Sequence, residues 1–139
     1  LAGVSSAMAA PEGYALPDPT LRLIGDIGAR TGAQVDVYES PEEAVRGADV
    51  VYTDVWASMG QEDSYAQRKE AFTGYAVTSK LMTLAKADAI FMHDLPAHRG
   101  EEVMDDVIEG PQSVVFDQAE NRLHAQKAIL ALIAGDLGQ

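Results

Sequence analysis

Short apolar runs in this chain alternate with longer stretches in which apolar and polar residues recur at helical spacing. The run at 50–55 has few polar interruptions, which is the pattern of a parallel strand covered by helices on both faces. The run at 89–92 repeats that pattern. The predicted strands span 4–9, 35–38, 50–55, 89–92 and 113–116.

Helix boundaries are marked by proline, serine, threonine and glycine. Asp18-Pro19 supplies an N-cap and a proline at the first helical position, and Gly32 offers a left-handed stop. Ser40 and Glu43 have the spacing of a capping box. The predicted helices span 19–30, 41–47, 61–71, 78–84 and about 117–135.

Strands that alternate with helices predict an α/β fold, which we expect to be a three-layer Rossmann-like domain with a mostly parallel sheet. One domain is expected over residues 1–139. The chain starts at Leu1 without an initiator methionine, so we expect it to be truncated at its N-terminal end. Ligands of such sheets bind beyond the carboxyl ends of the strands, where Asp54, His93, Asp94 and Asp117 are expected to share one rim.

Composition narrows the classes of partner. The chain has 22 acidic and 10 basic residues, a net charge of -12, and this charge disfavours nucleic acid and anionic membranes. No apolar run approaches the roughly 20 residues of a membrane helix, so a soluble, cytoplasmic protein is expected. The absence of cysteine from the sequence removes thiolate nucleophiles and thiolate metal sites.

The segment from Asp54 to Gly60 carries the strongest local chemistry. A carboxylate leaves the strand, and a turn containing Ser58 and Met59 follows. The carboxylate suits an ammonium group, and the hydroxyl and backbone N–H groups suit a carboxylate, so the segment can hold both ends of an amino acid. The alternative is that Asp54 caps the next segment and an ordinary turn follows.

Two further groups stand out by position. Arg122 lies in the first turns of the last helix, where the helix dipole disfavours a cation, so it either faces an outside anion or is offset by Asp117 and Glu120. His93 and Asp94 have the chemistry of metal ligands, but Pro96 prevents a helix that would align them with a second histidine. We therefore expect no metal and expect His93 to orient its loop or accept a backbone hydrogen bond.

Three motifs together resemble the ornithine carbamoyltransferases: Asp-x-x-x-Ser-Met-Gly at 54–60, His-Asp-Leu-Pro at 93–96 and Glu-Asn-Arg-Leu-His at 120–124. The similarity extends over about residues 11–135. It implies that Asp54, Ser58 and Met59 hold the amino-acid end of ornithine. It also implies that Gly60 is the pivot of a loop that closes over the substrates.

The resemblance assigns the second and third motifs to the carbamoyl group. Leu95 and the residue at position 94 contact that group in the family, while His93 and Pro96 shape the loop. The family has cysteine where this chain has Asp94, and the added charge favours binding of the δ-ammonium but disfavours the neutral amine nucleophile. Arg122 is implied to polarise the carbamoyl carbonyl oxygen.

The resemblance therefore implies the ornithine-binding C-terminal half of a carbamoyltransferase of arginine biosynthesis. Its partners would be L-ornithine and carbamoyl phosphate, the latter bound mainly by an N-terminal domain whose phosphate loop is absent from this sequence. No cofactor is implied, and the parent enzyme is expected to be a homotrimer. Two alternatives stay open: a non-catalytic amino-acid-binding module, and a carbamoyltransferase for another amine. A dinucleotide-binding fold lacks its glycine-rich turn.

Overall fold

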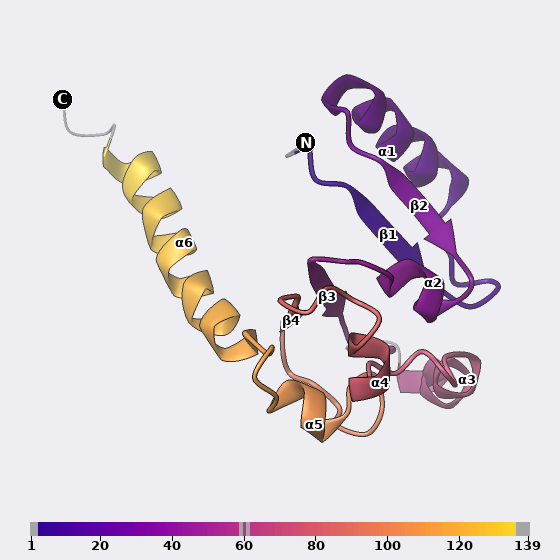
Figure 1. The fold of residues 1–139 in the computed structure, drawn as a ribbon. Coiled ribbons are helices and arrows are strands. Elements are labelled where there is room, and N and C mark those ends of the chain that lie inside the picture. Colours follow the sequence, from indigo (N-terminus) through magenta and orange to yellow (C-terminus); the bar gives the residue numbers. More distant parts are fainter. Residues whose placement is uncertain (1–2, 59, 61, 136–139) are drawn as a thin grey trace.

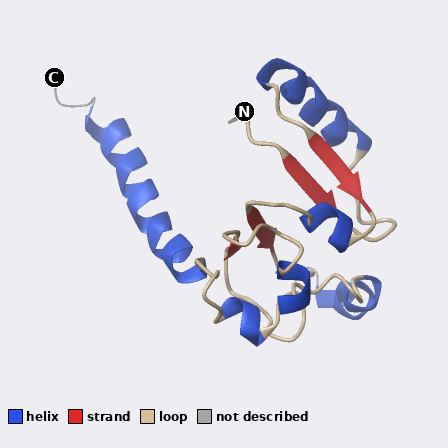
Figure 2. Cartoon of the chain, viewed as in Figure 1, coloured by secondary structure: helices blue, strands red, loops and turns tan. Residues whose placement is uncertain are grey.

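The structure is a computed structural model that describes residues 3–58, 60 and 62–135. Helices and strands alternate along the chain (Figures 1 and 2), which confirms the predicted α/β class. The strands are β1 (Ser6–Ala9), β2 (Val35–Tyr38), β3 (Val50–Thr53) and β4 (Ile90–His93). The helices are α1 (Asp18–Thr31), α2 (Pro41–Val45), α3 (Tyr65–Ala71), α4 (Ser79–Met82), α5 (Asp105–Ile108) and α6 (Val115–Gly135), with a 3-10 turn η1 (Glu62–Ser64) before α3.

The described strands form two parallel pairs, β1 with β2 and β3 with β4. Both pairs are parallel, as expected, but in the described part of the chain they are not joined into one sheet, and residues of β1 and β3 line a cavity of about 840 Å³. The expectation that helices cover both faces of the 50–55 run is wrong. Val51 is buried, but Val50 and Tyr52 are exposed and line the same cavity.

The hydrophobic core gathers around the β3–β4 pair. Phe91 of β4 is fully buried at its centre, and Val115, the first residue of α6, is fully buried against it. The buried members are Val45, Val51, Val77, Leu81, Met82, Phe91, Val103, Val107, Ile108 and Val115. Because tightly packed interiors deform little, this core gives the ends of β3 and β4 a rigid base.

Local capping follows the sequence closely. The Thr78 hydroxyl accepts the N–H of Leu81 at 3.1 Å, and the Ser40 hydroxyl accepts the N–H of Glu43 at 3.3 Å. Gly32 ends α1 with a φ of 78°, in the left-handed region that glycine adopts without strain. The α1 start differs by one residue from the prediction, because Asp18 is its first residue and Pro17 is the N-cap.

The predicted strand at 113–116 is wrong. Ser113 makes a single parallel bridge to Phe91, and α6 begins two residues later, at Val115. A short apolar run is compatible with a buried strand and with the buried start of a helix, so the apolar residues around Val115 could not distinguish the two elements. Helix α5 was not predicted, since its four residues are too few to show a periodic pattern.

Helix α6 extends away from the rest of the molecule (Figure 1). Val115 is its only buried residue. Its large apolar side chains beyond that point are exposed: Phe116, Leu123, Ile129, Leu130, Leu132 and Ile133. None of the described helices is long and apolar enough to cross a membrane.

Candidate functional site

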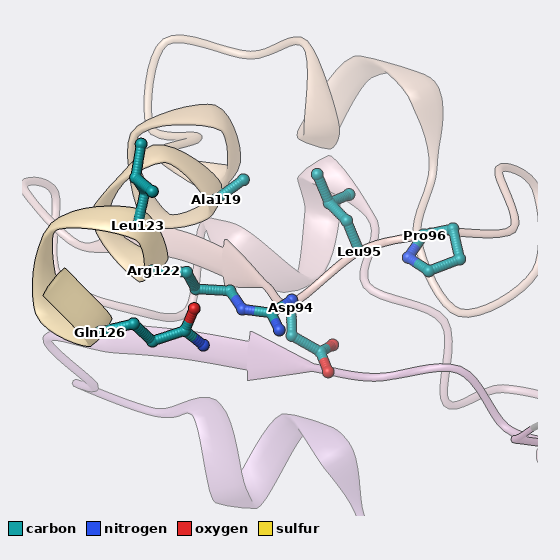
Figure 3. A pocket seen from close by; sticks show the side chains of 7 residues that line it. All are labelled: Asp94, Leu95, Pro96, Ala119, Arg122, Leu123 and Gln126. Atoms are coloured by element: carbon teal, nitrogen blue, oxygen red, sulfur yellow. The ribbon is translucent and has the colours of Figure 1, made fainter. Parts of the chain in front are cut away.

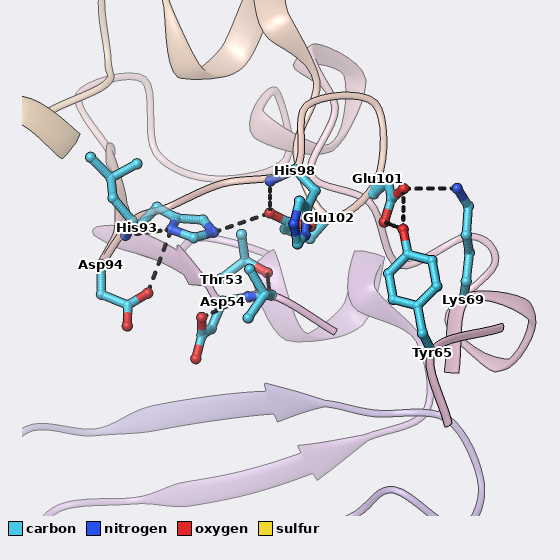
Figure 4. Close-up of polar contacts among 11 residues, drawn as sticks. Thr53, Asp54, Tyr65, Lys69, His93, Asp94, His98, Glu101 and Glu102 are labelled. Atoms are coloured by element: carbon cyan, nitrogen blue, oxygen red, sulfur yellow. Dashed lines mark hydrogen bonds and ion pairs between the residues drawn. The ribbon is translucent and has the colours of Figure 1, made fainter. Parts of the chain in front are cut away.

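The pairing of β3 with β4 determines the geometry of the site. Thr53 pairs with His93 in parallel register, so the next residues, Asp54 and Asp94, leave the sheet side by side. The ligand atoms of Asp54, His93 and Asp94 all lie within 4.8 Å of one another. Figure 4 shows the two carboxylates at the ends of their strands. The structure therefore brings these three predicted residues together. Asp117, which was expected at the same rim, lies instead in the first turn of α6.

Asp54 begins the segment that sequence analysis singled out. Its Oδ1 accepts the N–H of Val55 at 2.6 Å, and its side chain remains exposed. Ser58 is also exposed, and Gly60 has a φ of 85°, a backbone conformation that suits glycine. Met59 lies outside the described residues.

Trp56 anchors the start of this segment to helix α3. Its indole ring stacks on Phe72 with 5.8 Å between ring centroids. Its carbonyl oxygen accepts a hydrogen bond from the Arg68 guanidinium at 3.1 Å. These contacts fix the part of the segment close to Asp54.

A second hollow lies where α6 meets the turn after β4. It has a volume of about 600 Å³ (Figure 3). Its lining residues are Asp94, Leu95, Pro96, Ala119, Arg122, Leu123 and Gln126. The Arg122 side chain extends from α6 toward Asp94, so the predicted carbamoyl-contacting residues share one space with the predicted guanidinium.

Arg122 is available for a ligand. Among the described residues its guanidinium makes no ion pair, and Glu120 is paired instead with His124 at 3.6 Å. This arrangement disfavours the alternative in which nearby carboxylates on the helix offset the cation. A guanidinium that faces an open hollow can bind a carbonyl oxygen on which negative charge develops.

Sequence reasoning missed Gln118 and Tyr52. The Gln118 side-chain oxygen accepts the backbone N–H of His93 at 3.0 Å, which ties α6 to the end of β4. Gln118 lies on α6 four residues before Arg122, but nothing near it in the sequence indicates that its partner is His93, 25 positions away. Partial desolvation raises the pKa of the Tyr52 hydroxyl, and the charges of Asp94 and Asp54 raise that pKa further, so Tyr52 lies close enough to feel both carboxylates.

Two groups of side chains within the described chain contain three metal-type ligands each. In the first, His93 Nδ1 accepts the N–H of Leu95, so this nitrogen is occupied. In the second, His98, Glu101 and Glu102 gather, but Glu101 is bound by Lys69 at 2.8 Å and by the Tyr65 hydroxyl. Lys69 already supplies the positive charge in that group. Neither group is preorganised for an ion.

The alternation of strands and helices, with polar residues at the ends of β3 and β4, is that of an α/β ligand-binding domain. Residues 1–133 match the family model "Aspartate/ornithine carbamoyltransferase, Asp/Orn binding domain", and the chain belongs to this family. The similar proteins are mainly named ornithine carbamoyltransferase. One from Symbiobacterium thermophilum is 59% identical over 132 residues, which cover 94% of this chain and 42% of that protein.

Solved structures agree with this assignment. The ornithine carbamoyltransferase of Pyrococcus furiosus superposes with a TM-score of 0.85 and 51% identity, over 93% of this chain and 41% of that chain. A crystal structure of an N-acetyl-L-ornithine transcarbamylase mutant superposes with a TM-score of 0.78 and 30% identity, over 93% of this chain and 40% of that chain. The chain thus spans about two fifths of the length of the relatives it matches.

Proposed function

We propose that this chain supplies the ornithine side of an ornithine carbamoyltransferase. The observation that carries the proposal is the convergence of three charged side chains. Asp54 and Asp94 lie together at the ends of β3 and β4, and Arg122 faces Asp94 across one hollow. This arrangement offers anionic groups to a diamino acid and a cation to the carbonyl oxygen of its acyl donor.

The amino-acid end of ornithine binds at the 54–60 segment in this proposal. The Asp54 carboxylate pairs with the α-ammonium, and the Ser58 hydroxyl, Met59 and the backbone N–H groups of the turn hold the α-carboxylate. Gly60 lets the segment close over the ligand. The family resemblance and the exposure of Asp54 and Ser58 support these roles.

The reaction joins the two substrates at the 94–96 turn. The δ-amine nitrogen of ornithine bonds to the carbamoyl carbon, the bond from that carbon to the phosphate oxygen breaks, and the amine releases a proton. Citrulline and phosphate are the products. Arg122 stabilises the charge that develops on the carbonyl oxygen, and Leu95 contacts the carbamoyl group. The phosphate is held by the part of the relatives that this chain does not match.

Asp94 sets the efficiency of this step. Its carboxylate attracts the δ-ammonium but also raises the pKa of that amine, which lowers the fraction of neutral nucleophile. It repels the phosphate of the second substrate as well. We therefore expect the chain to support slower carbamoyl transfer than a variant with the family cysteine at position 94.

A carbamoyltransferase for another amine is the second candidate. It is favoured by the similarity to an N-acetyl-L-ornithine transcarbamylase, together with Asp94 in the hollow next to Arg122. A substrate with a modified amine, or with a side chain of a different length, would place a different group opposite the Asp94 carboxylate. Assays with ornithine and N-acetylornithine side by side separate the two candidates.

Complementation tests the proposal. The chain is mixed with the separately expressed part of the S. thermophilum relative that it does not match, and citrulline formation from ornithine and carbamoyl phosphate is measured. The chain and its Asp94→Cys variant are compared. We expect both mixtures to form citrulline, and we expect the Asp94→Cys variant to form it faster than the unmodified chain. If a complex forms but neither version produces citrulline, while ornithine still binds, the chain is instead a non-catalytic amino-acid-binding module.

A further inference from the structure

Helix α3 depends on its side-chain contacts to stay attached to the rest of the molecule. All seven of its residues are described, and none of them is buried. A helix needs roughly 12 residues or more to be stable alone in water, so the order of α3 comes from the side chains that reach other segments. Two sets of contacts leave the helix, one through Arg68 and Phe72 and the other through Tyr65 and Lys69.

The first set joins α3 to the backbone beside Asp54. The Arg68 guanidinium donates a hydrogen bond to the carbonyl oxygen of Trp56 at 3.1 Å. Phe72, the C-cap of α3, stacks on the Trp56 ring. Trp56 is only two residues beyond Asp54, so a displacement of α3 is transmitted to the end of β3.

The second set joins α3 to a single carboxylate. Tyr65 and Lys69 are four residues apart and therefore lie on one face of the helix. The Tyr65 hydroxyl donates to the Glu101 carboxylate, with 2.6 Å and 2.7 Å to its two oxygens, and the Lys69 ammonium donates to Oε1 at 2.8 Å (Figure 4). Lys69 Nζ also lies 5.9 Å from the centre of the Tyr65 ring. One side chain outside the helix thus holds two residues of it.

Glu101 stands on a rigid support. Glu102 and Val103, which follow it, are fully buried, and the carbonyl oxygen of Glu102 accepts the N–H of Val77 at 2.9 Å. The N–H of Glu101 itself donates to the carbonyl oxygen of His98 at 3.0 Å. Its side chain is only 17% exposed, so water screens this contact less than it screens an open surface ion pair.

We infer that Glu101 is a positioning residue that fixes α3 against the loop at 97–103 and thereby sets where Trp56 and the backbone beside Asp54 lie. Hydrogen bonds to a charged group are stronger than neutral ones, and here two of them meet on one anchored carboxylate. The consequence for ornithine binding rests on the proposed function, but the attachment of α3 does not.

Amide hydrogen exchange of the free chain tests the inference without any substrate. Glu101→Ala removes both acceptor oxygens. The Phe72 amide, which donates to the Arg68 carbonyl oxygen at the end of α3, should exchange about tenfold faster, the scale of one lost hydrogen bond to a charged group. The Phe91 amide in the core should keep its rate. Unchanged exchange at Phe72 overturns the inference.

The fluorescence of Trp56 gives a second measurement, because the sequence contains one tryptophan. Glu101→Ala should lower the fluorescence anisotropy, since α3 no longer restrains the ring. Glu109→Ala is the matched control, because it also removes a carboxylate that pairs with a cation, in this case Arg99. The control should leave both the anisotropy and the Phe72 exchange rate unchanged, and an equal fall of anisotropy in both variants would overturn the role of Glu101.

A charge exchange separates positioning from a general loss of stability. Glu101→Lys places two ammonium groups together and should accelerate exchange at Phe72. Combining it with Lys69→Glu restores an ion pair and should return the rate toward that of the unmodified chain. A double variant that exchanges as fast as Glu101→Lys alone overturns the inference.

The complemented enzyme shows the consequence for the site. Glu101→Ala should raise the KM for ornithine while kcat changes little, because it displaces the backbone beside Asp54 and leaves Arg122 in place. If the complemented enzyme forms no citrulline at all, the proposed function fails, while exchange at Phe72 still decides the attachment of α3.

Discussion

The carboxylates of Asp54 and Asp94 lie within 4.8 Å of each other, although the two residues are forty positions apart in the sequence. The parallel register of β3 and β4 produces this proximity, because Thr53 and His93 are paired immediately before them. Like charges so close repel each other, and a bound cation relieves that repulsion. The pair is thus suited to receive an ammonium group.

Asp54→Asn should weaken ornithine binding. The substitution keeps the shape of the side chain but removes the charge that pairs with the ammonium, and we expect affinity to fall roughly 10- to 100-fold. Titration followed by Trp56 fluorescence measures the change, since its ring stacks on Phe72 beside this segment. Asp88→Asn, another exposed aspartate, is the control, and equal affinities in both variants would contradict the role of Asp54.

Asp94→Asn should stabilise the folded chain. Asp94 Oδ1 is buried without a hydrogen-bond partner in the described chain and lies 3.5 Å from His93 Nδ1. An amide at this position removes the repulsion from Asp54 and is expected to increase the free energy of unfolding by up to about 1 kcal/mol. Thermal unfolding should shift upward by a few degrees. Asp26→Asn on exposed α1 should show no shift.

Arg122→Gln should reduce turnover in the complemented enzyme far more than it raises the KM for ornithine. The guanidinium makes no ion pair in the described chain, so its loss does not leave a protein charge unpaired. Removal of one donor to a developing oxyanion costs about 100- to 1000-fold in kcat. Steady-state kinetics with Arg22→Gln as the control provide the measurement. A change confined to KM would assign Arg122 to binding alone.

The Glu101 ion pair should make stability depend on pH in the acid range. The hydrogen bond from Lys69, and then that from Tyr65, lower the pKa of Glu101 below its usual 4.5. A carboxyl with a lowered pKa stabilises the folded state above its ordinary pKa, and this contribution is lost as pH falls through the lowered value.

Thermal unfolding between about pH 6 and about pH 3 measures this loss. Glu101→Gln should flatten the acid limb of the stability curve, because glutamine does not titrate. Glu70→Gln on exposed α3 is the control and should keep the slope of the unmodified chain. Equal slopes in all three proteins would show that Glu101 adds nothing to acid stability.

Phe91→Ala should be strongly destabilising. Phe91 is fully buried in the core beneath the site, and truncation of a buried phenylalanine typically costs about 3–5 kcal/mol. Phe116→Ala is the matched control, because the Phe116 side chain is 61% exposed at the start of α6. Urea denaturation of both variants gives the comparison, and similar midpoints would contradict the placement of Phe91 at the centre of the core.

Local signals in the sequence predicted much of the secondary structure. Three helix boundaries depend only on residues close in the sequence: the caps at Ser40 and Thr78 and the stop at Gly32. Such boundaries can therefore be predicted from the sequence alone. The Val114-Val115-Phe116 run was misassigned because burial of one residue at a helix start resembles a strand. The separation of the strands into two pairs depends on long-range pairing, which no local pattern encodes.

The candidate site was predictable to a similar degree. The rule that ligands bind beyond strand ends correctly brought Asp54 and Asp94 together. Gln118 and Glu102 were missed because their partner, His93, is distant in the sequence. Neither Gln118 nor Glu102 belongs to a sequence motif that indicates a contact with His93. Only the fold shows that three separate segments meet at this histidine.

Helix α6 is held to the rest of the molecule near its start, where Val115 is buried and Gln118 contacts the backbone of His93. At 1.5 Å per residue, Arg122 is about 10 Å along the axis from Val115, and the far end is about 30 Å away. A tilt of about 5° would move Arg122 by roughly 1 Å, enough to alter a catalytic contact, and would displace the tip by nearly 3 Å. A contact that covered the exposed apolar side chains at the far end of α6 and tilted the helix would therefore also move the Arg122 guanidinium.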